Sequence, residues 1–96
     1  MYKGHWMDSS WELAFAKKLD EINEPWERGE KTLPYTDREG NERIYHPDFW
    51  LPNRGLFLEI KGYWTEKSRH KVENAITRNH VNLLSLESPE DIKNFT

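Results

Sequence analysis

Apolar residues at helical spacing stand out near the start of the chain. They recur at i, i+4, i+8 and i+11, and are Trp11, Phe15, Leu19 and Ile22. A serine just before them, Ser9 or Ser10, can cap a helix, and Pro25 ends it. We therefore predict a first helix over residues 9–23.

A second helical pattern lies in the C-terminal half of the chain. Thr65 can cap this helix, which would extend to about Asn79. Its inner face would carry the apolar residues Val72, Ala75 and Ile76. Residues 88–95 are expected to form a short capped helical turn, with Pro89 at its first position.

Four shorter runs, rich in apolar and β-branched residues, predict strands. They cover residues 33–36, 43–51, 56–62 and 81–86. The turn sequence "DREGN" follows the first run, and the turn Pro52–Gly55 joins the second to the third. The element order is α-β-β-β-α-β, so we expect residues 1–96 to form one α/β domain with a mixed sheet.

Charged residues interrupt the apolar pattern of the predicted hairpin. With Pro52–Gly55 as a four-residue turn, Leu51 faces Leu56 and Asp48 faces Glu59. Alternation then gives one face that is a credible core, made of Phe49, Leu51, Leu56, Leu58 and Ile60. The other face carries His46, Asp48, Trp50, Phe57, Glu59 and Lys61.

The opposed acids suggest a particular chemistry. Directly opposed residues have Cβ atoms roughly 4.5–5.5 Å apart, so Asp48 and Glu59 would repel each other unless a cation lies between them. Hard oxygen ligands suit Mg²⁺ or Mn²⁺. Lys61 beside such an ion would hold a phosphate oxygen or orient a water. This is a constellation for metal-assisted phosphodiester hydrolysis.

A simpler interpretation of the same residues is a surface hairpin with a charged outer face. Lys61 would then only offset the two acids. That interpretation explains less well why the charges fall within such an apolar strand pair.

Composition narrows the class of protein. Of 96 residues, 32% are charged and 14% are aromatic, so a core built around aromatic side chains is feasible. The absence of cysteine excludes disulfides and cysteine zinc sites, and the four histidines are too scattered for a zinc site. No apolar run is long enough for a signal or a membrane span, so we expect a cytoplasmic protein that binds no membrane. The net charge of −3 argues against a nonspecific polycation but does not exclude nucleic acid.

The motifs "HPDF" and "LEIKG" resemble the PD-(D/E)XK nuclease motif, with Asp48, Glu59 and Lys61 in its places. With "SSWELAFAKKLD" added, the chain is similar to small phage and homing-type endonucleases related to very short patch repair endonucleases. The resemblance spans Ser9 to Leu86. It implies a restriction-endonuclease-like αβββαβ core and Mg²⁺-dependent cleavage of DNA that leaves 5′-phosphate and 3′-hydroxyl ends. Compared with many such relatives, the chain is smaller and lacks the insertions that usually carry sequence recognition.

The resemblance also suggests further site residues. Relatives often add a glutamate from the first helix, and Glu12 matches that position. Its alternative role is structural, because Ser9 and Glu12 form the S-x-x-E pattern of a capping box. The backbone carbonyl of Ile60 is a plausible third metal ligand beside Asp48 and Glu59.

A polar stripe on the second predicted helix is a candidate DNA-binding surface. It carries Lys67, Lys71, Asn74 and Arg78 at i, i+4, i+7 and i+11, and Arg69 and His70 lie near the helix start. An ordinary solvated helix face would have the same pattern. His46 would face the site and touch substrate, or be merely solvated. Trp50 would stack on a base or fill the core.

The expected function is therefore a metal-dependent endodeoxyribonuclease that nicks or cuts double-stranded DNA as a monomer or homodimer. Asp48, Glu59, Lys61 and Glu12 would be its catalytic residues, with Mg²⁺ replaceable by Mn²⁺. One alternative is a branched-DNA resolvase or transposase-like subunit of the same fold. Another is a non-catalytic DNA-binding or protein-interaction module, which would bind without metal and never cut.

Overall fold

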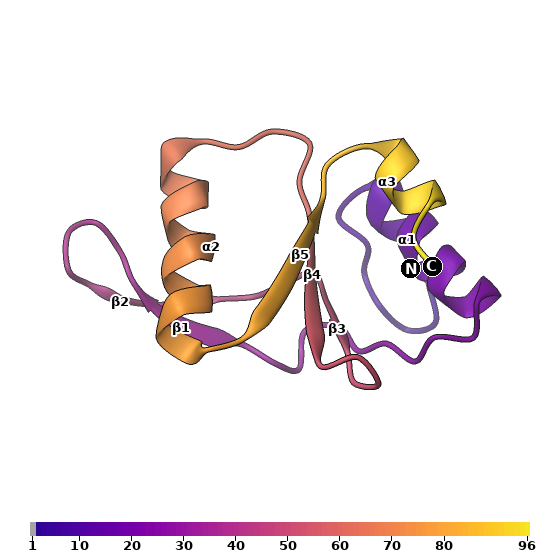
Figure 1. Cartoon of the computed structure of the whole chain (residues 1–96), viewed down its shortest axis with the longest axis horizontal. Helices are drawn as coiled ribbons and strands as arrows, with labels where there is room; N and C mark the ends of the chain where they lie inside the picture. The colour runs from indigo at the N-terminus through magenta and orange to yellow at the C-terminus, as the bar shows by residue number, and fades with distance from the viewer. Residues whose placement is uncertain (1) are drawn as a thin grey trace.

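The computed structural model describes residues 2–96. Along them lie α1 (Ser10–Glu21), β1 (Leu33–Thr36), β2 (Glu42–Tyr45), β3 (Phe49–Leu51), β4 (Leu56–Ile60), α2 (Glu66–Asn79), β5 (Asn82–Leu86) and α3 (Pro89–Lys93) (Figure 1). They form a small mixed α/β domain with two sheets. None of the helices in this part of the chain is long and apolar enough to cross a membrane.

The predicted helices are confirmed, with their caps. The Ser9 hydroxyl accepts a hydrogen bond from the backbone N–H of Glu12 at 3.2 Å, which satisfies a free donor in the first turn of α1. Thr65 and Ser68 form a reciprocal capping box at the start of α2. Ser88 caps α3, which has Pro89 in its first turn.

The larger sheet has the strand order β3-β4-β5. The hairpin register is the predicted one, because Leu51 pairs with Leu56 and Phe49 pairs with Leu58. From β4 the chain crosses through α2 and returns as β5, which pairs parallel to β4. Figure 1 shows α2 on one side of this sheet and α1 and α3 on the other.

The single strand predicted over residues 43–51 is wrong. It is divided into β2 and β3, which belong to different sheets, because β2 pairs only with β1. Pro47 lies in the break and has no backbone N–H to donate to a ladder. The predicted strand 56–62 likewise stops at Ile60. The strands therefore form two sheets where one was expected.

Both faces of the β3-β4 hairpin are covered. On one face, α1, α3 and the sheet enclose a first core cluster of Phe15, Ala16, Leu19, Phe49, Leu51, Leu58, Leu86, Ile92 and Phe95. On the other face, a second core cluster holds Leu33, Tyr45, Phe57, Val72 and Ala75. This overturns the interpretation as a surface hairpin with a charged outer face, since Glu59 is only 7% exposed.

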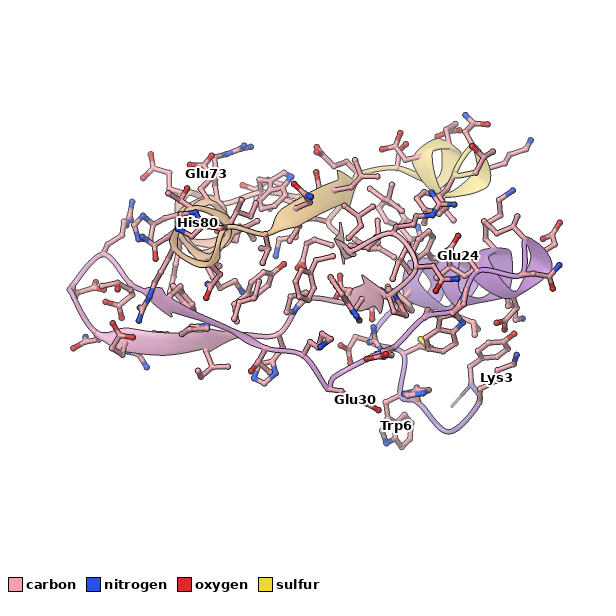
Figure 2. All side chains as sticks on the ribbon, turned by 60° about the horizontal axis from the view of Figure 1, so that its bottom comes forward. Lys3, Trp6, Glu24, Glu30, Glu73 and His80 are labelled. Carbon is pink, nitrogen blue, oxygen red and sulfur yellow. The ribbon has the colours of Figure 1, made fainter. Side chains whose placement is uncertain are left out.

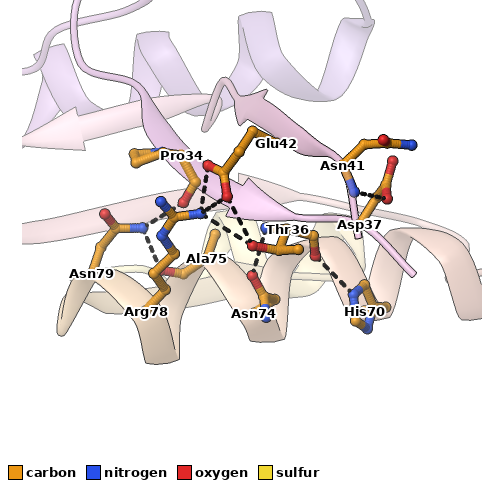
Figure 3. A network of polar contacts seen from close by, with 10 residues as sticks. All are labelled: Pro34, Thr36, Asp37, Asn41, Glu42, His70, Asn74, Ala75, Arg78 and Asn79. Atoms are coloured by element: carbon orange, nitrogen blue, oxygen red, sulfur yellow. Dashed lines mark hydrogen bonds and ion pairs between the residues drawn. The ribbon is translucent and has the colours of Figure 1, made fainter. Parts of the chain in front are cut away.

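Polar side chains of α2 form hydrogen bonds and an ion pair with the β1-β2 hairpin. The Asn74 side chain accepts from the Thr36 N–H at 2.9 Å, and a ring nitrogen of His70 lies 3.1 Å from the Thr36 carbonyl oxygen. Arg78 donates to the Glu42 carboxylate at 2.7 Å (Figure 3). Much of the polar stripe predicted on this helix thus contacts the hairpin.

We expect Leu58→Ala to lower the free energy of unfolding by roughly 2–5 kcal/mol, because it opens a cavity in the first core cluster. Leu58 is fully buried, whereas its register partner Leu84 on β5 is 42% exposed. Leu84→Ala, the matched control, should cost about 1 kcal/mol or less. Urea unfolding followed by tryptophan fluorescence measures both, and equal losses would contradict this packing.

Candidate functional site

Three carboxylates lie near one another where α1, the break between β2 and β3, and the end of β4 meet. Each has a specific hydrogen-bond donor. The Ile60 N–H donates to Asp48 Oδ2 at 2.7 Å, and the Tyr45 hydroxyl donates to Glu59 Oε2 at 2.7 Å. The guanidinium of Arg28 pairs with Glu12. The capping-box role considered for the Glu12 carboxylate is thus replaced by an ion pair.

Burial and mutual repulsion disfavour the charged forms of these acids. Burial, followed by the neighbouring charge of Glu59, raises the pKa of Asp48 to about 7, while the Ile60 hydrogen bond opposes the rise. Burial also raises the pKa of Glu59 against the hydrogen bond from Tyr45. The charge of Glu12 raises the pKa of both Asp48 and Glu59, so the three acids interact electrostatically.

Two lysines act on the same carboxylate from different elements. The charges of Lys61, just after β4, and Lys71, on α2, both lower the pKa of Glu59. The Lys61 ammonium lies 5.9 Å from the centre of the Trp64 ring, and the Lys71 ammonium lies 5.3 Å from that of Tyr45. Lys71, predicted only as a DNA-backbone contact, is thus a neighbour of the acids.

The loop that carries Lys61 packs tightly on α1. A Cβ atom at Gly62 would lie 3.0 Å from the Trp11 ring, tighter than most real Cβ contacts, so glycine allows this approach without a shift of the ring. Because Trp11 immediately precedes Glu12, the contact fixes the lysine loop beside the helix that supplies the third acid.

The donor set suits a hard divalent cation. Two oxygen ligands of like charge, Asp48 and Glu59, repel each other, and a cation between them would replace that repulsion with attraction. Within residues 2–96, no three histidine or acidic side chains are already gathered around one point as ligands. The fit therefore rests on the two opposed carboxylates, with the Ile60 carbonyl and Glu12 as the other predicted oxygen donors.

Arg28 is a candidate site residue that sequence reasoning missed. Its side chain is 11% exposed, and it pairs with Glu12 and donates to the Asp48 carbonyl oxygen at 2.8 Å. It lies in the irregular segment "WERGEK", where an arginine has no periodic neighbours that would single it out. Only the folded chain brings it to the acids.

The other residues predicted to contact DNA form two groups: some are exposed, and others make contacts within the fold. Lys67 and Arg69 are exposed on the first turns of α2, with Arg69 over the Trp64 ring at 5.2 Å. His46 is exposed beside Asp48, in a shallow hollow that Arg28 also lines. Engaged in contacts within the fold are His70 with Thr36, Arg78 with Glu42, and Trp50 with Phe57. Binding of DNA by any of these residues stays a prediction.

Comparisons of the chain with models of known protein families, with curated proteins and with solved structures gave no match.

The raised pKa of Asp48 predicts how stability depends on pH without metal. The native state holds this proton more tightly than the unfolded chain, whose aspartate has the usual pKa of 3.8. The resulting stabilisation is full below about pH 4 and is lost as pH rises to about 7. Asp48→Asn keeps an oxygen for the Ile60 N–H and carries no charge. In EDTA it should melt higher than wild type at pH 8, and the gap should shrink toward pH 4.

Melting curves at several pH values test this expectation. Asp8→Asn is the control, because its carboxylate lies in the same hollow but its side chain is 81% exposed, so its 3.5 Å contact with Arg28 contributes little to stability. It should leave the melting temperature at pH 8 almost unchanged. A variant at Asp48 that melts at or below wild type throughout would show that the acids do not destabilise each other.

Proposed function

We propose that this protein is a Mg²⁺-dependent endonuclease that hydrolyses phosphodiester bonds in DNA, with Mn²⁺ as a substitute. The observation that carries the proposal is the pair of acids, Asp48 and Glu59, whose charges interact inside the fold within reach of the Lys61 ammonium. Burying two like charges destabilises the fold, and apolar residues at the same positions would pack without that cost. A site that receives a cation and a phosphate gives them a role.

The strand order supports assignment to the PD-(D/E)XK nucleases with a restriction-endonuclease-like core. The antiparallel hairpin β3-β4, the crossing α2 and the parallel strand β5 follow the later part of the expected αβββαβ order. Helices lie on both sides of this sheet. The β1-β2 hairpin is a separate sheet and departs from a single mixed sheet.

The side chains have complementary roles in this proposal. Asp48, Glu59 and the Ile60 carbonyl would hold the ion, and Tyr45 orients Glu59 through its hydroxyl. When bound, the ion would supply charge stabilisation at the phosphate and a more acidic water. Lys61 orients the attacking water and stabilises negative charge that develops on the phosphate. Glu12 accepts a hydrogen bond from a water or serves as a further ligand.

The start of α2 is the favoured contact with the DNA backbone. Lys67 and Arg69 are exposed there, and they follow the loop that carries Lys61. Positive side chains so placed would bind phosphates on either side of the scissile bond. A monomer with one site cuts one strand per encounter, so nicking is the expected outcome.

Lys61→Ala should lower the rate of plasmid cleavage by ~10²–10⁴-fold, because one catalytic or charge-stabilising group is removed from the transition state. Fold and DNA binding should be retained. The measurement is conversion of supercoiled plasmid to nicked and linear forms in Mg²⁺, Mn²⁺ or EDTA. Lys17→Ala, at an exposed lysine of α1, is the control and should cleave like wild type.

Three results of that assay would contradict the proposal. Cleavage that persists in EDTA would exclude the metal mechanism. Wild-type rates in Lys61→Ala would exclude this lysine from the chemistry. A wild-type protein that binds DNA and never cuts it would favour a non-catalytic binding module.

Replacing both Lys67 and Arg69 by alanine should flatten the salt dependence of DNA binding. Each phosphate contact that is lost lowers the slope of log K against log salt by about 0.9. Arg78→Ala should change the slope less, because Arg78 already pairs with Glu42. Binding measured by fluorescence anisotropy at four salt concentrations gives the slopes, and an unchanged slope would show that the start of α2 is only solvated.

A further inference from the structure

Arg28 joins three segments that are far apart in the sequence. Its Nε donates to the Trp6 carbonyl oxygen at 2.8 Å, and one terminal nitrogen donates to the Asp48 carbonyl oxygen at 2.8 Å. The other terminal nitrogen pairs with Glu12 on α1. The N-terminal segment, whose Trp6 side chain projects from the body in Figure 2, is thereby tied to α1 and to the chain just before β3.

The surroundings of Arg28 fix the orientation of its guanidinium. The group lies over the Phe49 ring, 5.1 Å from its centre, and only 11% of the side chain is exposed. A planar fork with several donors can bond two carbonyl oxygens and a carboxylate at once, which a lysine ammonium on a flexible stem cannot reproduce in the same geometry.

We propose that Arg28 is a positioning residue for the cation site: it holds the Glu12 carboxylate beside Asp48 and Glu59. This inference rests on the proposed function. The ion pair uses Glu12 Oε1, so the second oxygen of that carboxylate is left for an ion or its water. Arg28 also fixes the backbone at Asp48, so one side chain aligns two of the three acids.

The charge of Arg28 supports this role. Its positive charge lowers the pKa of Asp48, and Glu12 is itself only 6% exposed. A charged side chain buried to this degree is destabilising when its partner is removed. Without Arg28, the Glu12 carboxylate would lose the ion pair that orients it, and the site would lose an oxygen donor.

A second arginine offers a matched control with the same kind of contacts. Arg54 pairs with Glu24 at 2.9 Å, donates to the Thr96 carbonyl oxygen at 2.8 Å, and lies over the Phe95 ring. It joins the β3-β4 turn to the C-terminus. Arg54→Lys therefore shows how the loss of comparable arginine contacts affects stability and Mn²⁺ binding when they lie away from the three acids.

The first experiment measures unfolding in EDTA for wild type, Arg28→Lys, Arg28→Gln, Glu12→Gln and the double variant Arg28→Gln/Glu12→Gln. If the two side chains act through each other, the double variant loses less stability than the two single glutamine variants together. Additive losses would overturn the pairing. The double variant removes the charges of both Arg28 and Glu12, so neither is left buried without its partner. It therefore still tests the pairing if Arg28→Gln alone does not fold.

The second experiment measures Mn²⁺ affinity by calorimetry, and plasmid nicking, for the folded variants. Arg28→Lys should bind Mn²⁺ roughly 10–100-fold more weakly, the usual loss when a partner of a ligand is removed. Arg54→Lys should bind it like wild type. Arg28→Gln/Glu12→Gln should bind Mn²⁺ only slightly more weakly than Glu12→Gln, because most of the effect of Arg28 passes through that carboxylate and the rest through the Asp48 backbone.

The outcomes separate this inference from the proposed function. In one outcome, wild type binds Mn²⁺ and nicks DNA while Arg28→Lys keeps wild-type Mn²⁺ affinity. In that case Arg28 only stabilises the fold, so its role at the cation site is overturned while the proposed function stands. The same follows if Arg28→Lys and Arg54→Lys weaken Mn²⁺ binding equally. If wild type neither binds Mn²⁺ nor nicks DNA, both the proposed function and the role of Arg28 fall.

Discussion

Two acids, the half-buried Asp48 and the buried Glu59, interact where the β3-β4 hairpin meets α1, and the elements around them are arranged to accommodate their charges. Two core clusters, one on each face of the β3-β4 hairpin, enclose this part of the sheet, so Glu59 is buried and Asp48, beside the hollow, is half-buried. Acids there are tolerated only with donors, and Tyr45 and the Ile60 N–H provide them. The cost of burying charge is thereby reduced but not removed, as the raised pKa of both groups indicates.

The need to accommodate these charges accounts for the arrangement of elements around the sheet. Tyr45 reaches Glu59 because β2 leaves the hairpin at Pro47 and pairs with β1. Contacts such as that of Asn74 with Thr36 fix β1 against α2, and α2 brings Lys71 over the Tyr45 ring. On the opposite side, Arg28 ties α1 to the backbone of Asp48. Residues remote in sequence thus hold the acids in place.

The sequence predicted what depends on local patterns. The caps and the hairpin register follow from residues a few positions apart, such as Ser9 and the turn Pro52–Gly55. The strand break at Pro47 was missed although the proline signalled it, because the apolar alternation around it looked continuous. Arg28 gave no signal at all, since its partners are brought to it only by the tertiary fold. Arg78 did stand out on the polar stripe, but its ion pair with Glu42 could not be predicted, because Glu42 lies on another element.

The central claim is that Asp48 and Glu59 together form a divalent cation site. Calorimetric titration of Mg²⁺ into wild type, Asp48→Asn and Glu59→Gln tests it most directly. Each substitution removes one charge and keeps an oxygen to accept from Ile60 or from Tyr45. The account predicts saturable binding in wild type that is lost in both variants and kept in Glu42→Gln, whose acid pairs with Arg78 on the β1-β2 hairpin. Equal Mg²⁺ binding in all four proteins, or none in wild type, would contradict it.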